Sequence, residues 1–201
     1  IISHYDQLSA TRDNWIQKNK YFYSDDRNYM RFLVGSGQRI LEIGSGTGDL
    51  LASLQPSHGV GIDISAGMTQ QAENKYPDLT FLTGDIEDIN FLGRIKGPFD
   101  IIILSDAIGL LDDCQNTLKS LHRLCTPQTR LIVSYYSWTW EPFLKLAEKL
   151  SLKMPAKEMN WLSSGDVVNF LSLANFQTVK VDWRQLVPKR LLGLGYIINK
   201  F

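Results

Sequence analysis

Short apolar runs alternate with amphipathic stretches through most of the chain. Runs with the length and composition of buried strands lie at 39–43, 59–63, 79–82, 99–104 and 129–135. Between them, apolar residues recur at helical spacing, as in the set Cys114, Leu118, Leu121 and Cys125. Strands that alternate with helices predict right-handed βαβ units and a parallel sheet with both faces covered.

Polar residues at the start of the amphipathic stretches support this pattern. Ser65 precedes one stretch, Asp112 and Asp113 precede another, and Ser164 precedes a third that we expect to stop near Asn175. Such side chains accept hydrogen bonds from the first free amides of a helix. The pattern therefore predicts helices after the second, fourth and fifth strands.

The end of the chain breaks the alternation of strands and helices. Residues 176–187 and 194–201 both alternate apolar and polar positions, and only 188–193 separate them. Because this connection is too short for a crossover helix, we expect an antiparallel hairpin. The predicted fold is a Rossmann-like, doubly wound α/β sheet of seven strands, mostly parallel, with an antiparallel last strand.

The first 38 residues form a separate helical unit in this prediction. Leu8, Trp15 and Ile16 suggest one short helix, and Ser24 is expected to cap a second. The inner side of that second helix would carry Tyr29, Met30, Phe32 and Leu33. We predict that residues 1–38 are a lid, that it moves as a cover, and that residues 39–201 are the sheet domain.

Composition and charge exclude several classes of protein. A hydrophobic share of 44% is ample for a buried core, and 21 basic residues balance 21 acidic ones, which argues against nonspecific nucleic-acid binding. Two cysteines and three histidines are dispersed, so we expect neither a disulfide framework nor a metal site. No apolar run has the length of a membrane span, and no signal peptide is recognisable. We expect a cytoplasmic protein.

A glycine-rich turn follows the first predicted strand. Gly44, Gly46 and Gly48 alternate with other residues there, at the place where an α/β sheet binds nucleotide-like ligands. Asp49 stands where the dinucleotide fingerprint has its last glycine, and a carboxylate there would repel a pyrophosphate. With Glu42 as a second acid nearby, the turn favours a ligand that has a positive charge and no phosphate.

The pattern E-x-G-x-G-x-G at 42–48 resembles motif I of the class I methyltransferases that use S-adenosylmethionine. Asp63, at the end of the second strand, resembles the ribose-binding acid of that family, and Asp85-Ile86 resembles its adenine-binding turn. Asp106 resembles the polar residue that closes the fourth strand. The resemblance covers roughly residues 39–201 and implies a methyltransferase with this cofactor.

The resemblance also implies the cofactor-binding residues. Asp63 would accept hydrogen bonds from both ribose hydroxyls, Ile64 and Met68 would enclose the adenine, and Asp106 would help to hold the ammonium group. Met68 alternatively fits a core position. The complete predicted set is Glu42, Gly44, Ser45, Gly46, Gly48, Asp63, Ile64, Met68, Asp85, Ile86 and Asp106.

The methyl acceptor is harder to predict, because no motif identifies a catalytic base. The candidates that we name are His4, Tyr21 and Asp106, and an acidic pair at Asp25-Asp26 is either a helix N-terminus or part of the pocket mouth. Aromatic side chains suggest an acceptor that is flat, apolar or sugar-like, although at helical spacing they also suit a core. The predicted acceptor-contacting residues are Tyr5, Tyr23, Tyr135, Tyr136, Trp138 and Trp161.

A closer resemblance concerns residues 21–26, 134–142 and 160–163. These segments look like parts of bacterial methyltransferase modules that are joined to a family 2 glycosyltransferase. The resemblance implies a small-molecule, glycan or lipid-linked acceptor and a fused or associated glycosyltransferase. Two alternatives stay open: a noncatalytic S-adenosylmethionine-binding scaffold or regulatory module, and an NAD-type Rossmann enzyme, which Asp49 disfavours.

Overall fold

Five parallel strands form one sheet in the computed structural model, which describes residues 2–156 and 159–183. Their order is β3-β2-β1-β4-β5, and their bounds are β1 (Arg39–Ile43), β2 (His58–Asp63), β3 (Thr80–Thr83), β4 (Ile101–Ser105) and β5 (Arg130–Ser134). The five predicted strand runs are thus confirmed to within two residues at each end. The order reverses between β1 and β4, and ligands bind at such a switch point in open α/β sheets.

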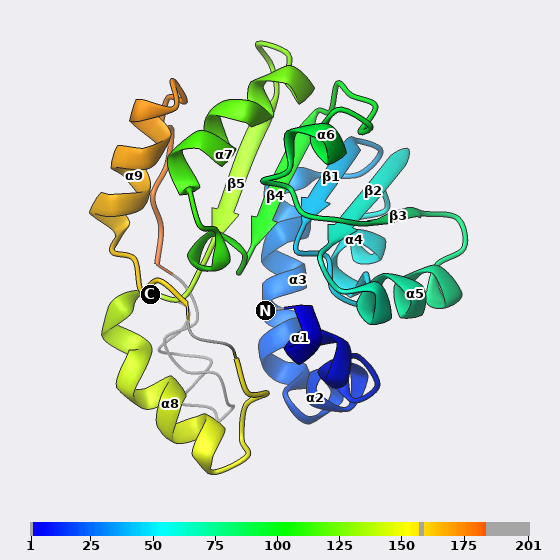
Figure 1. The fold of residues 1–201 in the computed structure, drawn as a ribbon, viewed down its shortest axis with the longest axis vertical. Coiled ribbons are helices and arrows are strands. Elements are labelled where there is room, and N and C mark those ends of the chain that lie inside the picture. Colours follow the sequence, from blue (N-terminus) through cyan, green and yellow to red (C-terminus); the bar gives the residue numbers. More distant parts are fainter. Residues whose placement is uncertain (1, 157–158, 184–201) are drawn as a thin grey trace.

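Helices cover both faces of the sheet (Figure 1). On one face lie α3 (Lys20–Val34), α4 (Asp49–Ser53) and α5 (Ala66–Lys75); on the other lie α6 (Ile89–Leu92), α7 (Cys114–Ser120) and α9 (Ser164–Leu173). Successive residues of a strand face opposite sides of the sheet and so enter different cores. Ile40 packs with Met30 of α3, and Leu41 packs with Leu118 of α7. Both faces are therefore buried, as predicted for a parallel sheet.

The remaining helices lie beyond the carboxyl ends of the strands, where Figure 1 shows α1 and α2 on one side and α8 on the other. Their bounds are α1 (Ile2–Ser9), α2 (Arg12–Lys18) and α8 (Glu141–Lys149). Short 3₁₀ turns span Ile108–Leu110, Leu121–Leu124 and Trp138–Trp140. Of these elements, Leu121–Leu124 lies at the amino ends of β4 and β5, where its Leu124 oxygen accepts from Phe99 N. The others border the edge at which the glycine turn opens.

Within residues 2–156 and 159–183 the sheet has five strands, all parallel, so the prediction of seven strands with an antiparallel last strand was wrong for the described part of the chain. Residues 176–183 form no strand, and the rest of the expected hairpin lies outside the described residues. Val179 is 95% exposed, so the alternation in this segment does not correspond to a buried face. Phe176 instead stacks on His122, with 4.2 Å between the ring centroids.

Two of the predicted helix caps are confirmed and two were wrong. Ser65 Oγ accepts from Met68 N at 3.2 Å, and Asp113 Oδ1 accepts from Asn116 N at 2.9 Å. The cap of α9 is Ser163, not Ser164, and it forms a capping box with Asp166. Ser24 caps nothing, because α3 already begins at Lys20.

The N-terminal segment differs in detail from its prediction. It contains two short helices before α3 rather than one, and Phe32 is 79% exposed instead of facing inward. Asp6 Oδ1 accepts from Ser65 Oγ at 2.5 Å and from Gly67 N at 3.1 Å, which attaches α1 to α5. A domain boundary at residue 38 and a movable lid stay predictions.

Candidate functional site

The glycine turn between β1 and α4 has a positive φ at each of its three glycines. At Gly46, φ is +52°, and a Cβ would have Arg12 Nε, 3.8 Å away, as its nearest neighbour. At Gly48, a Cβ would lie 2.6 Å from Cζ of Phe81. Gly46 thus leaves space beside the turn, whereas Gly48 lets the start of α4 pack against β3.

Asp63, the last residue of β2, holds the turn in place. Its Oδ2 accepts from Gly46 N at 2.8 Å, and its Oδ1 accepts from Ser65 N at 2.9 Å. Burial raises the pKa of Asp63 despite these two bonds. Because a carboxylate oxygen has more than one lone pair, both oxygens can still accept from a ligand.

Two other acids beside the turn have roles within the fold. Glu42 is 2% exposed, and its Oε2 accepts from Leu51 N at 3.0 Å, which joins β1 to α4. Burial raises the pKa of Glu42 well above its usual range. Asp49 pairs with Lys75 at 2.8 Å and also accepts from Thr47 and Tyr76. Since Lys75 compensates its charge, Asp49 is a weaker argument against a pyrophosphate than the sequence suggested.

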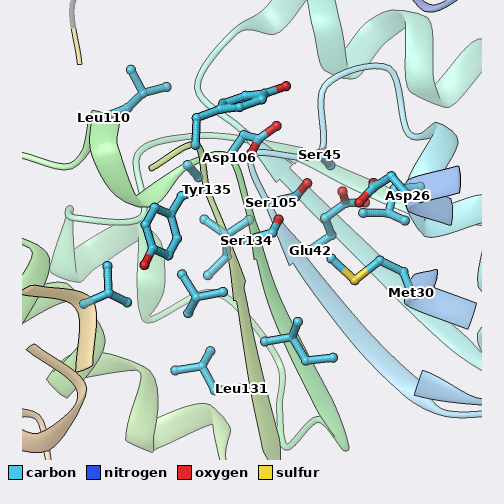
Figure 2. A pocket seen from close by; sticks show the side chains of 18 of the residues that line it. Asp26, Met30, Glu42, Ser45, Ser105, Asp106, Leu110, Leu131, Ser134 and Tyr135 are labelled. Carbon is cyan, nitrogen blue, oxygen red and sulfur yellow. The ribbon is translucent and has the colours of Figure 1, made fainter. Parts of the chain in front are cut away.

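A cavity of about 1590 Å³ extends from the glycine turn past the ends of β4 and β5 to α8. Part of its lining is drawn in Figure 2. Of the residues predicted from the sequence, those that line it are Glu42, Gly44, Ser45, Gly46, Asp63, Ile64, Met68, Asp85, Ile86 and Asp106, with Tyr5, Tyr23, Tyr135 and Tyr136 on the acceptor side.

Five other predicted residues are not among those that line this cavity: His4, Tyr21, Gly48, Trp138 and Trp161. His4 Nε2 lies 3.3 Å from the Pro155 carbonyl oxygen, and Trp138 is 55% exposed. The cavity thus brings together most of the predicted cofactor residues but only part of the predicted acceptor set.

Two acids with raised pKa values face the cavity near the ends of β1 and β4. Asp106 is exposed to the cavity; desolvation by the surrounding protein raises its pKa to about 7, and the charge of Asp26 adds to this effect. Desolvation likewise raises the pKa of Asp26, on α3, to about 6. Figure 2 shows Asp26 beside Glu42, with Asp106 facing the same cavity.

Sequence reasoning missed two cations that line the cavity, Arg12 on α2 and Lys153 after α8. Arg12 Nη1 donates to Tyr23 Oη at 3.1 Å. Lys153 pairs with Glu148 at 2.8 Å, and its Nζ lies 5.7 Å from the Tyr136 ring centroid. No local motif marks either residue, because tertiary packing alone brings them to the cavity.

The residues present fit S-adenosylmethionine. In the part of the chain that the structure describes, Ser45 Oγ is the one buried side-chain nitrogen or oxygen atom without a hydrogen-bond partner. Ser45 is a residue of the glycine turn that lines the cavity, and its Oγ lies 2.8 Å from the position that a Cβ of Gly61 would take. Ile64, Met68 and Ile86 supply an apolar wall for a purine. The amide of Glu87 donates to Oδ1 of Asp85 and leaves Oδ2 for the amino group of the purine. A positively charged ligand also suits the acids near β1 and β4.

Residues 2–156 and 159–183 contain neither a membrane-spanning helix nor a cluster of metal ligands. No helix there is long and apolar enough to cross a membrane. No group of three His, Cys, Asp or Glu side chains there has an arrangement that could hold a metal ion. Independence from metal stays a prediction.

Comparisons with known proteins identify the family. A family model described as a methyltransferase domain matches residues 15–181. The chain is 33% identical over 92 residues to demethylmenaquinone methyltransferase of Chlorobaculum tepidum, covering 44% of this chain and 37% of that protein. It is 29% identical over 150 residues to the ubiquinone/menaquinone biosynthesis C-methyltransferase UbiE of Vibrio parahaemolyticus, covering 69% of this chain and 56% of that protein. The chain thus spans about a third to a half of these curated relatives.

A solved structure has the same fold. It is a SAM-dependent methyltransferase and possible histamine N-methyltransferase from Thermotoga maritima, with a TM-score of 0.71 and 20% identity. The match covers 88% of this chain and 81% of that one. The chain therefore belongs to the methyltransferase-domain family and has the fold of a SAM-dependent methyltransferase.

Proposed function

We propose that the methyl group goes from S-adenosylmethionine, bound at the glycine turn, to a small molecule with a flat, apolar body, such as a quinol or another hydroxylated aromatic ring. The observation that carries this proposal is the continuity of the cavity from the glycine turn to a wall of aromatic side chains. The cavity also continues along the edge of β5 to residues 175–183, and the part of it between the glycine turn and α8 is where the acceptor would lie beside the cofactor.

The aromatic wall lies between the N-terminal helices and the segment around α8. Phe22 stacks on Tyr136 with 6.2 Å between ring centroids and an angle of 17° between the planes, and Trp140 packs on Phe143 at 5.6 Å. Aromatic faces favour a flat ring over a flexible polar chain. The two curated relatives are named for quinone substrates, which supports the same class of acceptor.

Asp106 is the residue best placed to manage the acceptor's proton. The bound cofactor would supply a methyl group made electrophilic by its sulfonium. Desolvation raises the pKa of Asp106 to about 7, into the range in which a carboxylate can accept a hydroxyl proton from the acceptor near neutral pH. Lys153 adds a positive charge on the acceptor side of the cavity. That charge would stabilise the negative charge on an acceptor oxygen that loses its proton.

The raised pKa values predict that cofactor affinity depends on pH. The cofactor's ammonium group favours the ionised form of Asp106, whose pKa is about 7, and of Asp26, whose pKa is about 6. Affinity for S-adenosylhomocysteine should therefore rise roughly tenfold between pH 5.5 and pH 8. Calorimetry at both pH values measures this, and Asp106→Asn should flatten the profile. Affinity that is constant or falls over this range contradicts the prediction.

The acceptor class is tested by offering the purified chain methyl-labelled S-adenosylmethionine with naphthoquinols, simple phenols and polyprenyl-phosphate sugars. The proposal predicts label on the aromatic acceptors. Label on the sugars alone would instead support the glycan- or lipid-linked acceptor, and the fused or associated glycosyltransferase, that the sequence resemblance implies. Tight cofactor binding without transfer to any acceptor would favour the noncatalytic module.

A further inference from the structure

Arg12 is a half-buried cation whose hydrogen bonds go to neutral side chains. Its Nη1 donates to Tyr23 Oη at 3.1 Å and to Met154 Sδ at 3.7 Å, and the guanidinium carbon lies 5.4 Å from the Tyr23 ring centroid. Every ion pair among the described residues involves a lysine, so none includes Arg12. The negative charges of Asp63 and Asp106 act on Arg12, but neither carboxylate forms an ion pair or hydrogen bond with it. Its guanidinium therefore has donors that can meet an anionic group of a ligand.

The position of Arg12 says which part of a ligand it would meet. Its Nε lies 3.8 Å from where a Gly46 Cβ would be, so the guanidinium is directly above the turn over which the cofactor is expected to pass. Asp63, which is expected to hold the ribose, bonds to the Gly46 amide on the same turn. Arg12 therefore faces the part of the ligand that lies beyond the ribose.

Asp26 supplies the opposite charge from the neighbouring helix. It lines the same cavity, and Figure 2 shows its carboxyl group beside that of Glu42. Within residues 2–156 and 159–183, no hydrogen bond or ion pair holds the carboxylate of Asp26, whereas Glu42 already accepts from the Leu51 amide. Its nearest charged neighbours are Arg27, Asp25, Glu42 and Asp106.

The cavity thus has a cation on α2 and an anion on α3, each without a partner of opposite charge in an ion pair, at the turn where the cofactor's amino-acid end would lie. That end carries one carboxylate and one ammonium group. We propose that Arg12 and Asp26 bind these two groups, so that the N-terminal helices, and not only the sheet, recognise the cofactor. This inference rests on the proposed binding of S-adenosylmethionine at the glycine turn.

The assignment has a structural consequence. The helices that carry Arg12 and Asp26 also carry the acceptor-side residues Phe22 and Tyr23, which lie between them in the sequence. Binding of the cofactor's amino-acid end would therefore fix the aromatic wall that meets the acceptor. Cofactor binding and the shape of the acceptor site would be coupled through α2 and α3.

Calorimetry on the full chain at pH 8 tests the proposal with two ligands that both lack the sulfonium charge. S-adenosylhomocysteine has the amino-acid end, and 5′-methylthioadenosine has the same nucleoside and sulfur without it. Arg12→Gln and Asp26→Asn should each weaken S-adenosylhomocysteine binding at least tenfold and change 5′-methylthioadenosine binding less than twofold. Lys18→Gln on α2 and Asp25→Asn on α3 remove the same charges outside the cavity and should change neither affinity.

Each other outcome has a clear meaning. Wild-type affinity of both variants for S-adenosylhomocysteine would overturn the proposal. An equal loss for both ligands would also overturn it, because the residues would then act on the fold of the site rather than on the amino-acid end. A wild-type chain that binds neither ligand would overturn the proposed function, and this inference with it.

Discussion

Replacement of Gly46 by valine is expected to abolish S-adenosylmethionine binding, with a loss of more than about 100-fold or 2.7 kcal/mol. The residue has a φ of +52°, and its missing side chain would project into open space beside the turn. A branched side chain there would occupy the ligand's path. The left-handed backbone adds roughly 1–2 kcal/mol of strain, which a domain of ordinary stability survives.

A matched control separates ligand exclusion from backbone strain. Gly37 has a φ of +74° with no atom within 4 Å of its Cβ position, and it is not among the residues that line the cavity. Gly37→Val should cost comparable stability in thermal unfolding and leave the affinity unchanged. If both variants lose affinity together, strain rather than the ligand's path explains the effect.

Asp63→Ala is expected to weaken cofactor binding by about 2–3 kcal/mol, or roughly 30- to 150-fold. Two ribose hydroxyls would lose a charged acceptor, and the Gly46 amide would lose the bond that fixes the turn. Asp113→Ala is the matched control, because Asp113 also accepts from a backbone amide, as the N-cap of α7, but is not among the residues that line the cavity. Calorimetric affinity unchanged in Asp63→Ala would show that the ribose binds elsewhere.

The sequence could predict those parts of the site that lie on single, locally ordered segments. Residues 42–48, Asp63, Asp85 and Asp106 each lie at the end of a strand or within a few residues after it, so knowing the strands is enough to place them at one edge of the sheet. The parallel register then aligns the ends of β1, β2 and β4. Ser65 was predictable as a cap for the same reason, since its partner is three residues away.

Features that depend on contacts between residues far apart in the sequence could not be predicted from the sequence. Arg12 meets Tyr23 and Met154, and Lys153 meets Glu148 and the Tyr136 ring; no spacing along the chain announces these contacts. A helical stripe of Tyr23, Asp26, Met30 and Leu33 was visible and would have extended α3 back past Ser24. Conversely, alternation after Phe176 imitated a strand, although Val179 and Val181 are exposed.

The most direct measurement of the central claim is calorimetric titration of the purified chain with S-adenosylmethionine, S-adenosylhomocysteine and NAD. The geometry of the glycine turn, Asp63 and the acids near β1 and β4 predicts one site that binds the first two ligands and gives no response to NAD. Binding of NAD with no response to the other two would contradict it.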